Sequence, residues 1–537
     1  MQLMNLPPEL LREIISHLLE DDATGREYAD HGQPSLCALA LSGARGGLAE
    51  VATGLLYGAI TLERNGDVAR DEQRMVLLNR SCRANPQLVH RIRSADTRWF
   101  HQDYATPHYE EFLAHLARSK SLVSLKAQLG YPPPLLPAAA GGDTTAGGPL
   151  SALFQWQPGS FAALRELHVH MDNVDHAARV PVAFLVRLCE LPSLQDITIC
   201  APAAVDHDDD DVVGSRGGCG GEQHNSCDAS SEPPPTLGLT EMSFGYGRPV
   251  SMALLREVLP RTPNIRMLSM GLPGAAVEVN RKMCNDVSSG GYDLKGPVLS
   301  PRSIGRVLAP AAASLEQMDL VADNVSLPAQ HDGSRINLSA FDRLRHLEIS
   351  ACLLFGAGRG PVVSSGDDIW PCLPPALAKL TIAFDGDLGL FWSLTEMREH
   401  TRSGTFESQL WDRRLREDGD GLAWLAELLR RVTKGELGRQ MRRIAVEERE
   451  VVDRDRNWAI ATWRTPGGDR MQDLAQAAAV DLEVLLRVPR SFRSEEFDNV
   501  EDAEFYGKRG TVLYDEVRQG PSSTASPASE AGMDGDW

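Results

Sequence analysis

The chain has 537 residues and a formal net charge of −20, with 54 Lys and Arg against 74 Asp and Glu. This balance opposes binding to duplex nucleic acid, because phosphate recognition needs a basic surface. No apolar run approaches the roughly 18 residues that a membrane helix needs, and the first residues lack the basic start of a secretory signal. The nine cysteines have no regular spacing, which indicates reduced thiols in a cytoplasmic or nuclear protein.

The stretch 6–18 predicts an amphipathic helix at the N-terminus. Pro8 suits the first helical position, where its missing N–H would have no partner anyway, and Glu9 lies in the first turn, where the helix dipole favours an anion. Apolar residues recur after them at helical spacing. Two further apolar segments follow at 35–41 and 48–56, and then a short strand around Ile60. A domain this small buries little apolar surface, so we expect a partner to cover it.

These N-terminal residues resemble an F-box of the fungal type. The positions that carry the resemblance are Leu6, Pro7, Glu9, Leu10, Ile14, Leu18, Leu36, Leu39, Leu41 and Leu55. The resemblance implies that three helices bind a Skp adaptor through these residues, and through it a cullin ubiquitin ligase. The insertion at 20–34 and the glycines Gly43, Gly46 and Gly47 depart from the family pattern, which predicts weaker adaptor binding or a later start of the third helix. The alternative is an ordinary amphipathic helical hairpin.

Beyond residue 62 the chain alternates helix-like and strand-like segments. A helix and a strand are predicted within 68–95, and a second pair within 109–127. A hexamer with the pattern apolar-x-x-apolar-x-apolar then occurs seven times, starting at Leu164, Leu194, Leu239, Ile265, Leu315, Leu344 and Leu377, and an eighth starts at Met441. Helix-like runs precede several of them, at 181–188, 252–259 and 303–308. Strands at 458–463 and 482–488 around a helix at 471–480 would complete the series.

Most hexamers recur at intervals of about 30 residues, near the period of leucine-rich repeats. They resemble degenerate repeats of that kind, in which each unit adds a strand to a parallel sheet and a helix to its back. We therefore expect an α/β protein with a three-helix F-box-like domain (1–62), a leucine-rich-repeat-like solenoid (63–488) and an acidic, largely disordered tail (489–537). Disordered loops are expected near 132–149, 203–235 and 271–300. The rival architecture is a doubly wound α/β domain.

Period-two alternation predicts which side chains line the concave face of such a solenoid. Leu167, Ile197 and Leu347 would be buried, together with the apolar residues two positions after them. The concave face would carry Glu166, His168, His170, Asp196, Thr198, Glu241, Ser243, Gln317, Asp319, His346, Glu348, Lys379 and Thr381. This surface is polar and leans acidic, which suits a protein segment with some basic character.

No motif in the sequence points to catalysis, a cofactor or a metal. Phosphate-loop, zinc-protease and nucleophile-elbow patterns do not occur. Cys219, His224 and Cys227 offer three soft ligands where zinc usually takes four, and the acidic run 206–211 lacks the glycine of a calcium loop. The leading hypothesis is therefore a non-catalytic adaptor that presents a protein target for ubiquitination and degradation. The alternative is a repeat scaffold whose N-terminal segment only caps the first repeat.

Overall fold

The computed structural model describes residues 47–62, 68–97, 107–130, 159–172, 182–200, 236–245, 250, 252–272, 298–321, 330–356, 369–384, 390, 422–437, 440–448, 458–463 and 469–489. The predicted first two helices of the F-box, the predicted loop 132–149 and the acidic tail beyond residue 489 lie outside these residues. The predicted loop 203–235 also lies outside them. Of the predicted loop 271–300 only 271–272 and 298–300 are described, and Gly271 and Val298–Leu299 belong to strands.

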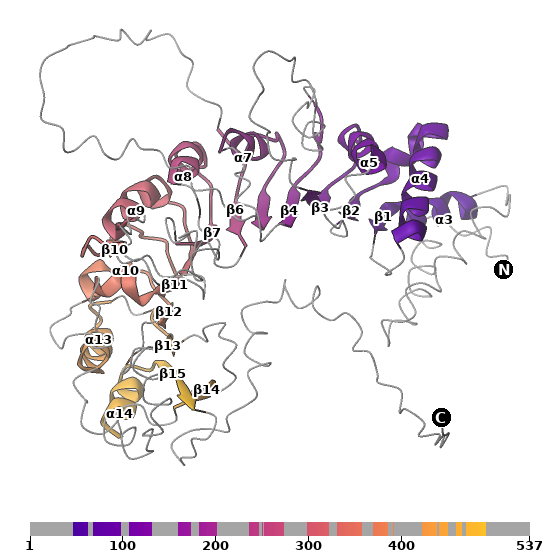
Figure 1. Cartoon of the computed structure of the whole chain (residues 1–537). Helices are drawn as coiled ribbons and strands as arrows, with labels where there is room; N and C mark the ends of the chain where they lie inside the picture. Colours follow the sequence, from indigo (N-terminus) through magenta and orange to yellow (C-terminus); the bar gives the residue numbers. More distant parts are fainter. Residues whose placement is uncertain are drawn as a thin grey trace, which may run out of the picture.

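The described chain forms an α/β arc around one long sheet (Figure 1). In spatial order the strands are β1 (Ala59–Thr61), β2 (Ser94–Thr97), β3 (Ser124–Gly130), β4 (Glu166–Asp172), β5 (Asp196–Cys200), β6 (Glu241–Phe244), β7 (Met267–Gly271), β9 (Gln317–Val321), β11 (His346–Ser350), β12 (Lys379–Phe384), β13 (Arg443–Glu448), β15 (Asp481–Pro489) and β14 (Trp458–Thr462). All neighbours in this sheet pair in parallel except β14, which is antiparallel to β15. Two short strands, β8 (Val298–Leu299) and β10 (Gln330–His331), form a separate parallel pair.

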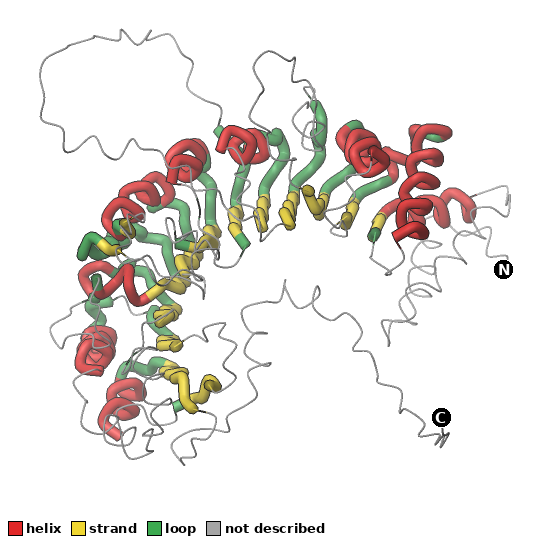
Figure 2. Tube along the Cα trace, in the orientation of Figure 1, coloured by secondary structure: helices red, strands yellow, loops and turns green. Residues whose placement is uncertain are grey.

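The helices lie on the outer, convex side of the arc, and the strands line the inner side (Figure 2). The α-helices are α3 (Gly47–Gly58), α4 (Val68–Ala84), α5 (Pro107–Ala117), α7 (Val182–Cys189), α8 (Met252–Val258), α9 (Pro301–Leu308), α10 (Ala351–Phe355), α13 (Ala423–Thr433) and α14 (Asp469–Ala477). Short 3-10 helices are η2 (Pro86–Arg91), η4 (Leu259–Arg261), η6 (Ala309–Ala311) and η7 (Trp370–Cys372). Among the described helices, none has the length and apolar character needed to cross a membrane. A doubly wound fold would carry helices on both faces, so the solenoid-like arrangement is the one observed.

The hexamer pattern explains the register of the sheet. The fourth hexamer residues form one continuous row across neighbouring strands: Leu167, Ile197, Met242, Leu268, Met318, Leu347, Leu380 and Ile444. All of them are buried between the sheet and the helices. Each repeat thus covers the apolar edge of the next, and the predicted burial of Leu167, Ile197 and Leu347 is confirmed.

The N-terminal end of the sheet reaches into the segment predicted as F-box. Strand β1 pairs with β2, and α3 packs beside η2, with Val51 and Ala52 buried. Arg91 Nη1 donates a hydrogen bond to the carbonyl oxygen of Glu50 at 3.1 Å. Residues 47–62 are therefore continuous with the solenoid.

Candidate interaction surface

Two rows of polar side chains run across the strands on the concave face, as the alternation predicted. In the first row, Glu166, Asp196 and Glu241 stand in register on the adjacent strands β4, β5 and β6. Parallel strands lie about 4.8 Å apart, so these carboxylates are nearest neighbours. Further along the same row, Gln317 stands beside His346 on β9 and β11. All five are partly or fully exposed.

The second row lies two residues later on the same strands. His168, Thr198 and Ser243 are in register on β4, β5 and β6, and Asp319 and Glu348 continue the row on β9 and β11. Each is half-buried. His170, another two residues along β4, is aligned with Cys200 and is also half-buried. The structure therefore brings all the predicted concave-face residues of β4 to β11 onto one surface.

In the second row the exposed part of this surface ends before β12, whereas Lys379, beside His346 in the first row, is exposed on β12 as predicted. Thr381 follows Glu348 in the second row, but it is only 4% exposed, against our expectation that it would line the surface. Ala445, the next residue in the row, is buried as well. Nearby, the backbone N–H of the buried Leu390 donates to Oε1 of Glu448 at 2.5 Å. On the C-terminal side the open part of the second row thus ends at β11.

The negative charges of the first row are not neutralised by ion pairs within the described residues. In the described part of the chain, Glu166, Asp196 and Glu241 form no ion pair; Thr240 Oγ1 donates a hydrogen bond to Asp196 Oδ1 at 3.1 Å. Burial, and then the nearby charge of Asp196, raise the pKa of Glu241 above its ordinary value. The first row therefore holds a local excess of negative charge.

On both flanks of the face the charges compensate each other. Lys126 Nζ lies 3.8 Å from Asp96 Oδ2 on the N-terminal side. On the C-terminal side Arg443 forms an ion pair with Glu483 and lies 4.0 Å from Asp481. A cationic partner would therefore be attracted to the middle of the face, from β4 to β6.

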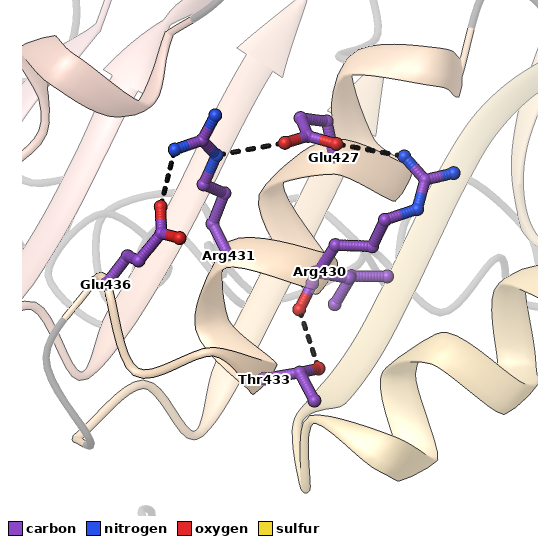
Figure 3. Close-up of polar contacts among 6 residues, drawn as sticks. Glu427, Arg430, Arg431, Thr433 and Glu436 are labelled. Atoms are coloured by element: carbon purple, nitrogen blue, oxygen red, sulfur yellow. Dashed lines mark hydrogen bonds and ion pairs between the residues drawn. The ribbon is translucent and has the colours of Figure 1, made fainter.

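A cluster of charged residues lies on and just after α13 (Figure 3). Arg430 Nη1 lies 3.0 Å from Glu427 Oε2, and Arg431 Nε lies 2.9 Å from Glu427 Oε1. Arg431 also pairs with Glu436 at 2.5 Å and stacks on the ring of Trp370, 4.2 Å from its centroid. The hydrogen bonds from the two arginines lower the pKa of Glu427. Each of these charged groups has a partner, and the stack of Arg431 on Trp370 joins α13 to η7. We therefore assign the cluster a role in stability and not in binding.

Sequence reasoning overlooked a row of exposed arginines at the second position of several hexamers. Arg165, Arg266 and Arg442 each stand one residue before the first residue of a strand, and Arg93 and Arg345 occupy the same place in other repeats. The signal was available in the repeat, because aligning the hexamers puts these residues in one column. The alternation pattern assigns a face only to the positions within the strands.

Other predicted sites remain predictions. Of the residues expected to contact a Skp adaptor, only Leu55 lies in the described part of the chain, on α3; the others precede residue 47. Cys219, His224, Cys227 and the acidic run 206–211 also lie outside it. Among the described residues, no group of three or more His, Cys, Asp or Glu side chains is placed to hold a metal ion.

Comparison with known proteins adds no relative. No protein-family model matches this chain, and no curated protein is significantly similar to it in sequence.

Proposed function

We propose that this protein is the substrate-recognition adaptor of a Skp–cullin–F-box ubiquitin ligase and that it holds a target protein on the concave face of its sheet. The observation that carries the proposal is the open face from β4 to β11, whose first row has the neighbouring carboxylates Glu166, Asp196 and Glu241 without ion pairs in the described chain. The F-box-like order of residues 6–55 supports the link to an adaptor.

In this proposal the chain performs no chemistry of its own. The N-terminal helices bind the Skp adaptor, and the sheet holds a basic segment of the target within reach of the ubiquitin-loading enzyme. Transfer is then accelerated because two reactants are kept close together. The negative charge of the first row speeds the encounter with this basic segment.

The test is co-purification with the full-length chain from cell extract, scored separately for adaptor and target. We expect Leu6→Ala/Pro7→Ala/Ile14→Ala to lose the adaptor and keep the target. We expect Asp196→Asn/Glu241→Gln to keep the adaptor and lose the target. The matched control Glu257→Gln/Asp473→Asn neutralises exposed carboxylates on α8 and α14 and should lose neither. Absence of any Skp adaptor from the wild-type purification would refute the proposal.

The second candidate is a repeat scaffold without ligase function. It is favoured by the pairing of β1 with β2, since residues 47–62 then serve as the N-terminal end of the solenoid. Deleting residues 1–46 leaves α3 and β1 in place and distinguishes the two. A scaffold would keep all its partners after this deletion, whereas a ligase adaptor would lose the Skp adaptor alone.

A further inference from the structure

Five exposed arginines line the edge of the sheet at which the parallel strands begin. They are Arg93, Arg165, Arg266, Arg345 and Arg442, here called the amino-edge row. Each immediately precedes its strand: β2, β4, β7, β11 and β13. The equivalent positions on the strands between them hold Val123, Gln195, Thr240, Glu316 and Ala378, of which only Glu316 is charged.

The backbone fixes the positions of these arginines. The carbonyl oxygen of Arg165 accepts hydrogen bonds from Gln195 N at 2.8 Å and Asp196 N at 2.9 Å. The carbonyls of Arg266 and Arg345 accept the same pair of bonds from the next repeat, at 2.8 and 2.9 Å in both cases. Their own N–H groups bond to the preceding repeat. The row is therefore a rigid frame, although its side chains extend into solvent.

The guanidinium groups form no ion pair in the described chain, although Glu316 lies in the same row between Arg266 and Arg345. No ion pair or side-chain hydrogen bond involves Arg93, Arg165, Arg266, Arg345 or Arg442 among the described residues. This is unusual in a chain whose formal net charge is −20. On α13, by comparison, Arg430 and Arg431 both pair with Glu427. The amino-edge row is thus a strip of available positive charge.

We propose that the amino-edge row binds an extended, acidic polypeptide segment that crosses the strands. Two strand spacings separate most neighbouring arginines and three separate Arg165 from Arg266. At about 4.8 Å per strand these gaps are about 10 and 14 Å, and the whole row spans about 43 Å. An extended chain rises about 3.3 Å per residue, so the segment has about 14 residues with an Asp or Glu at every third or fourth position.

The neighbouring carboxylates identify the ligand as a polypeptide. Glu166 follows Arg165 directly, and Asp196 and Glu241 continue its row on the next strands. These charges repel a nucleic acid or an anionic membrane, in which every unit is negative. A polypeptide can place acidic side chains on the arginines and basic ones on the carboxylates. This inference rests on the proposed function only in taking the ligand to be part of the target protein.

The test is fluorescence anisotropy with the full-length chain and labelled peptides of about 14 residues. One peptide has Glu at every third or fourth position among Ser and Gly, and its counterpart has Gln there. The variant is Arg165→Glu/Arg266→Glu/Arg345→Glu. The control, Arg80→Glu/Arg187→Glu/Arg306→Glu, makes the same charge change at exposed positions on α4, α7 and α9 of the convex side. A single-stranded oligonucleotide of equal charge is the competing probe.

We expect the Glu peptide to bind in low salt, the variant to weaken it by about tenfold or more, and the control to change it by less than about twofold. Equal affinity for the Glu and Gln peptides would overturn the proposal. So would equal losses in variant and control, or tighter binding of the oligonucleotide. The assay contains no Skp adaptor, so its outcome and that of the adaptor co-purification are independent.

Discussion

Replacing Glu241 by Gln should stabilise the fold while it weakens target capture. Glu241 stands in register with Asp196 on the next strand, and burial and this charge both raise the pKa of Glu241. Two unit charges about 5 Å apart in water repel each other by about 0.8 kcal/mol, and salt at 0.1 M reduces this to about 0.5 kcal/mol. We expect Glu241→Gln to raise the free energy of unfolding by about 0.5 kcal/mol at neutral pH.

The raised pKa of Glu241 determines how the stability gained by this substitution depends on pH. The carboxyl of Glu241 has a higher pKa in the folded than in the unfolded chain, so the folded state holds the proton more tightly. The wild type therefore loses stability as the pH rises from the unfolded pKa, about 4.3, through the raised folded pKa, and the loss stays constant above it. The gain from Glu241→Gln should accordingly be absent below about pH 4 and complete at pH 7.

Urea unfolding of the two proteins at acidic and neutral pH, in low and high salt, measures this difference. Glu257→Gln on α8 is the control for removing an exposed carboxylate and should have little effect. If Glu241→Gln lowered the stability, or if its effect were the same at every pH and salt concentration, the reasoning would be wrong. Loss of target together with a gain in stability would separate a binding role of Glu241 from a structural one.

Three further predictions concern a buried core leucine, a closely packed glycine and the contacts of Arg431. The midpoint of urea unfolding measures each. Leu268→Ala should lower the free energy of unfolding by about 2–5 kcal/mol, because this side chain is 0% exposed in the middle of the sheet. Ser269→Ala on the concave face should lower it by less than about 0.5 kcal/mol. Similar losses in the two variants would contradict the assigned faces. Gly245→Ala should lower the free energy of unfolding by about 1–3 kcal/mol, because the new Cβ would lie 2.8 Å from Cys200 Sγ and 3.1 Å from Cys200 Cα. If adding Cys200→Ala restored the full stability, the contact with Cys200 Cα would contribute nothing to the loss. Arg431→Ala should lower the urea midpoint, because it removes two ion pairs and a stack on an indole, and Arg431→Lys should recover only part of the loss; complete recovery would mean that the stack contributes nothing.

The strands were predictable because the apolar hexamer recurs at a repeat period and helix-like runs precede several of its instances. All eight hexamers became strands, and the predicted helices at 181–188, 252–259 and 303–308 correspond to α7, α8 and α9. The same spacing determines which side chains face the helices, so the concave rows could be assigned as well. Repeats that differ in sequence still share this pattern, since each must bury the edge of its neighbour.

Other features had no periodic signal. The strand at 458–463 was predicted, but its antiparallel direction as β14 was not, because an alternating pattern is the same in both directions. Strands β8 and β10 have two residues each, too few to show a period. The burial of Thr381 depends on chain segments distant in sequence, which a local pattern does not report.

The reversed last strand also bears on self-association. A sheet built from repeats has two open ends, and stacking of one copy on the next would produce filaments. Such growth would require β14 of one copy to pair with β1 of another. Since β14 runs against all the other strands of its sheet, it does not offer the parallel hydrogen-bonding pattern that joins the repeats from β1 to β15. A second copy that joined at this end would therefore form an antiparallel pair with β14 and would not be added as one more parallel repeat.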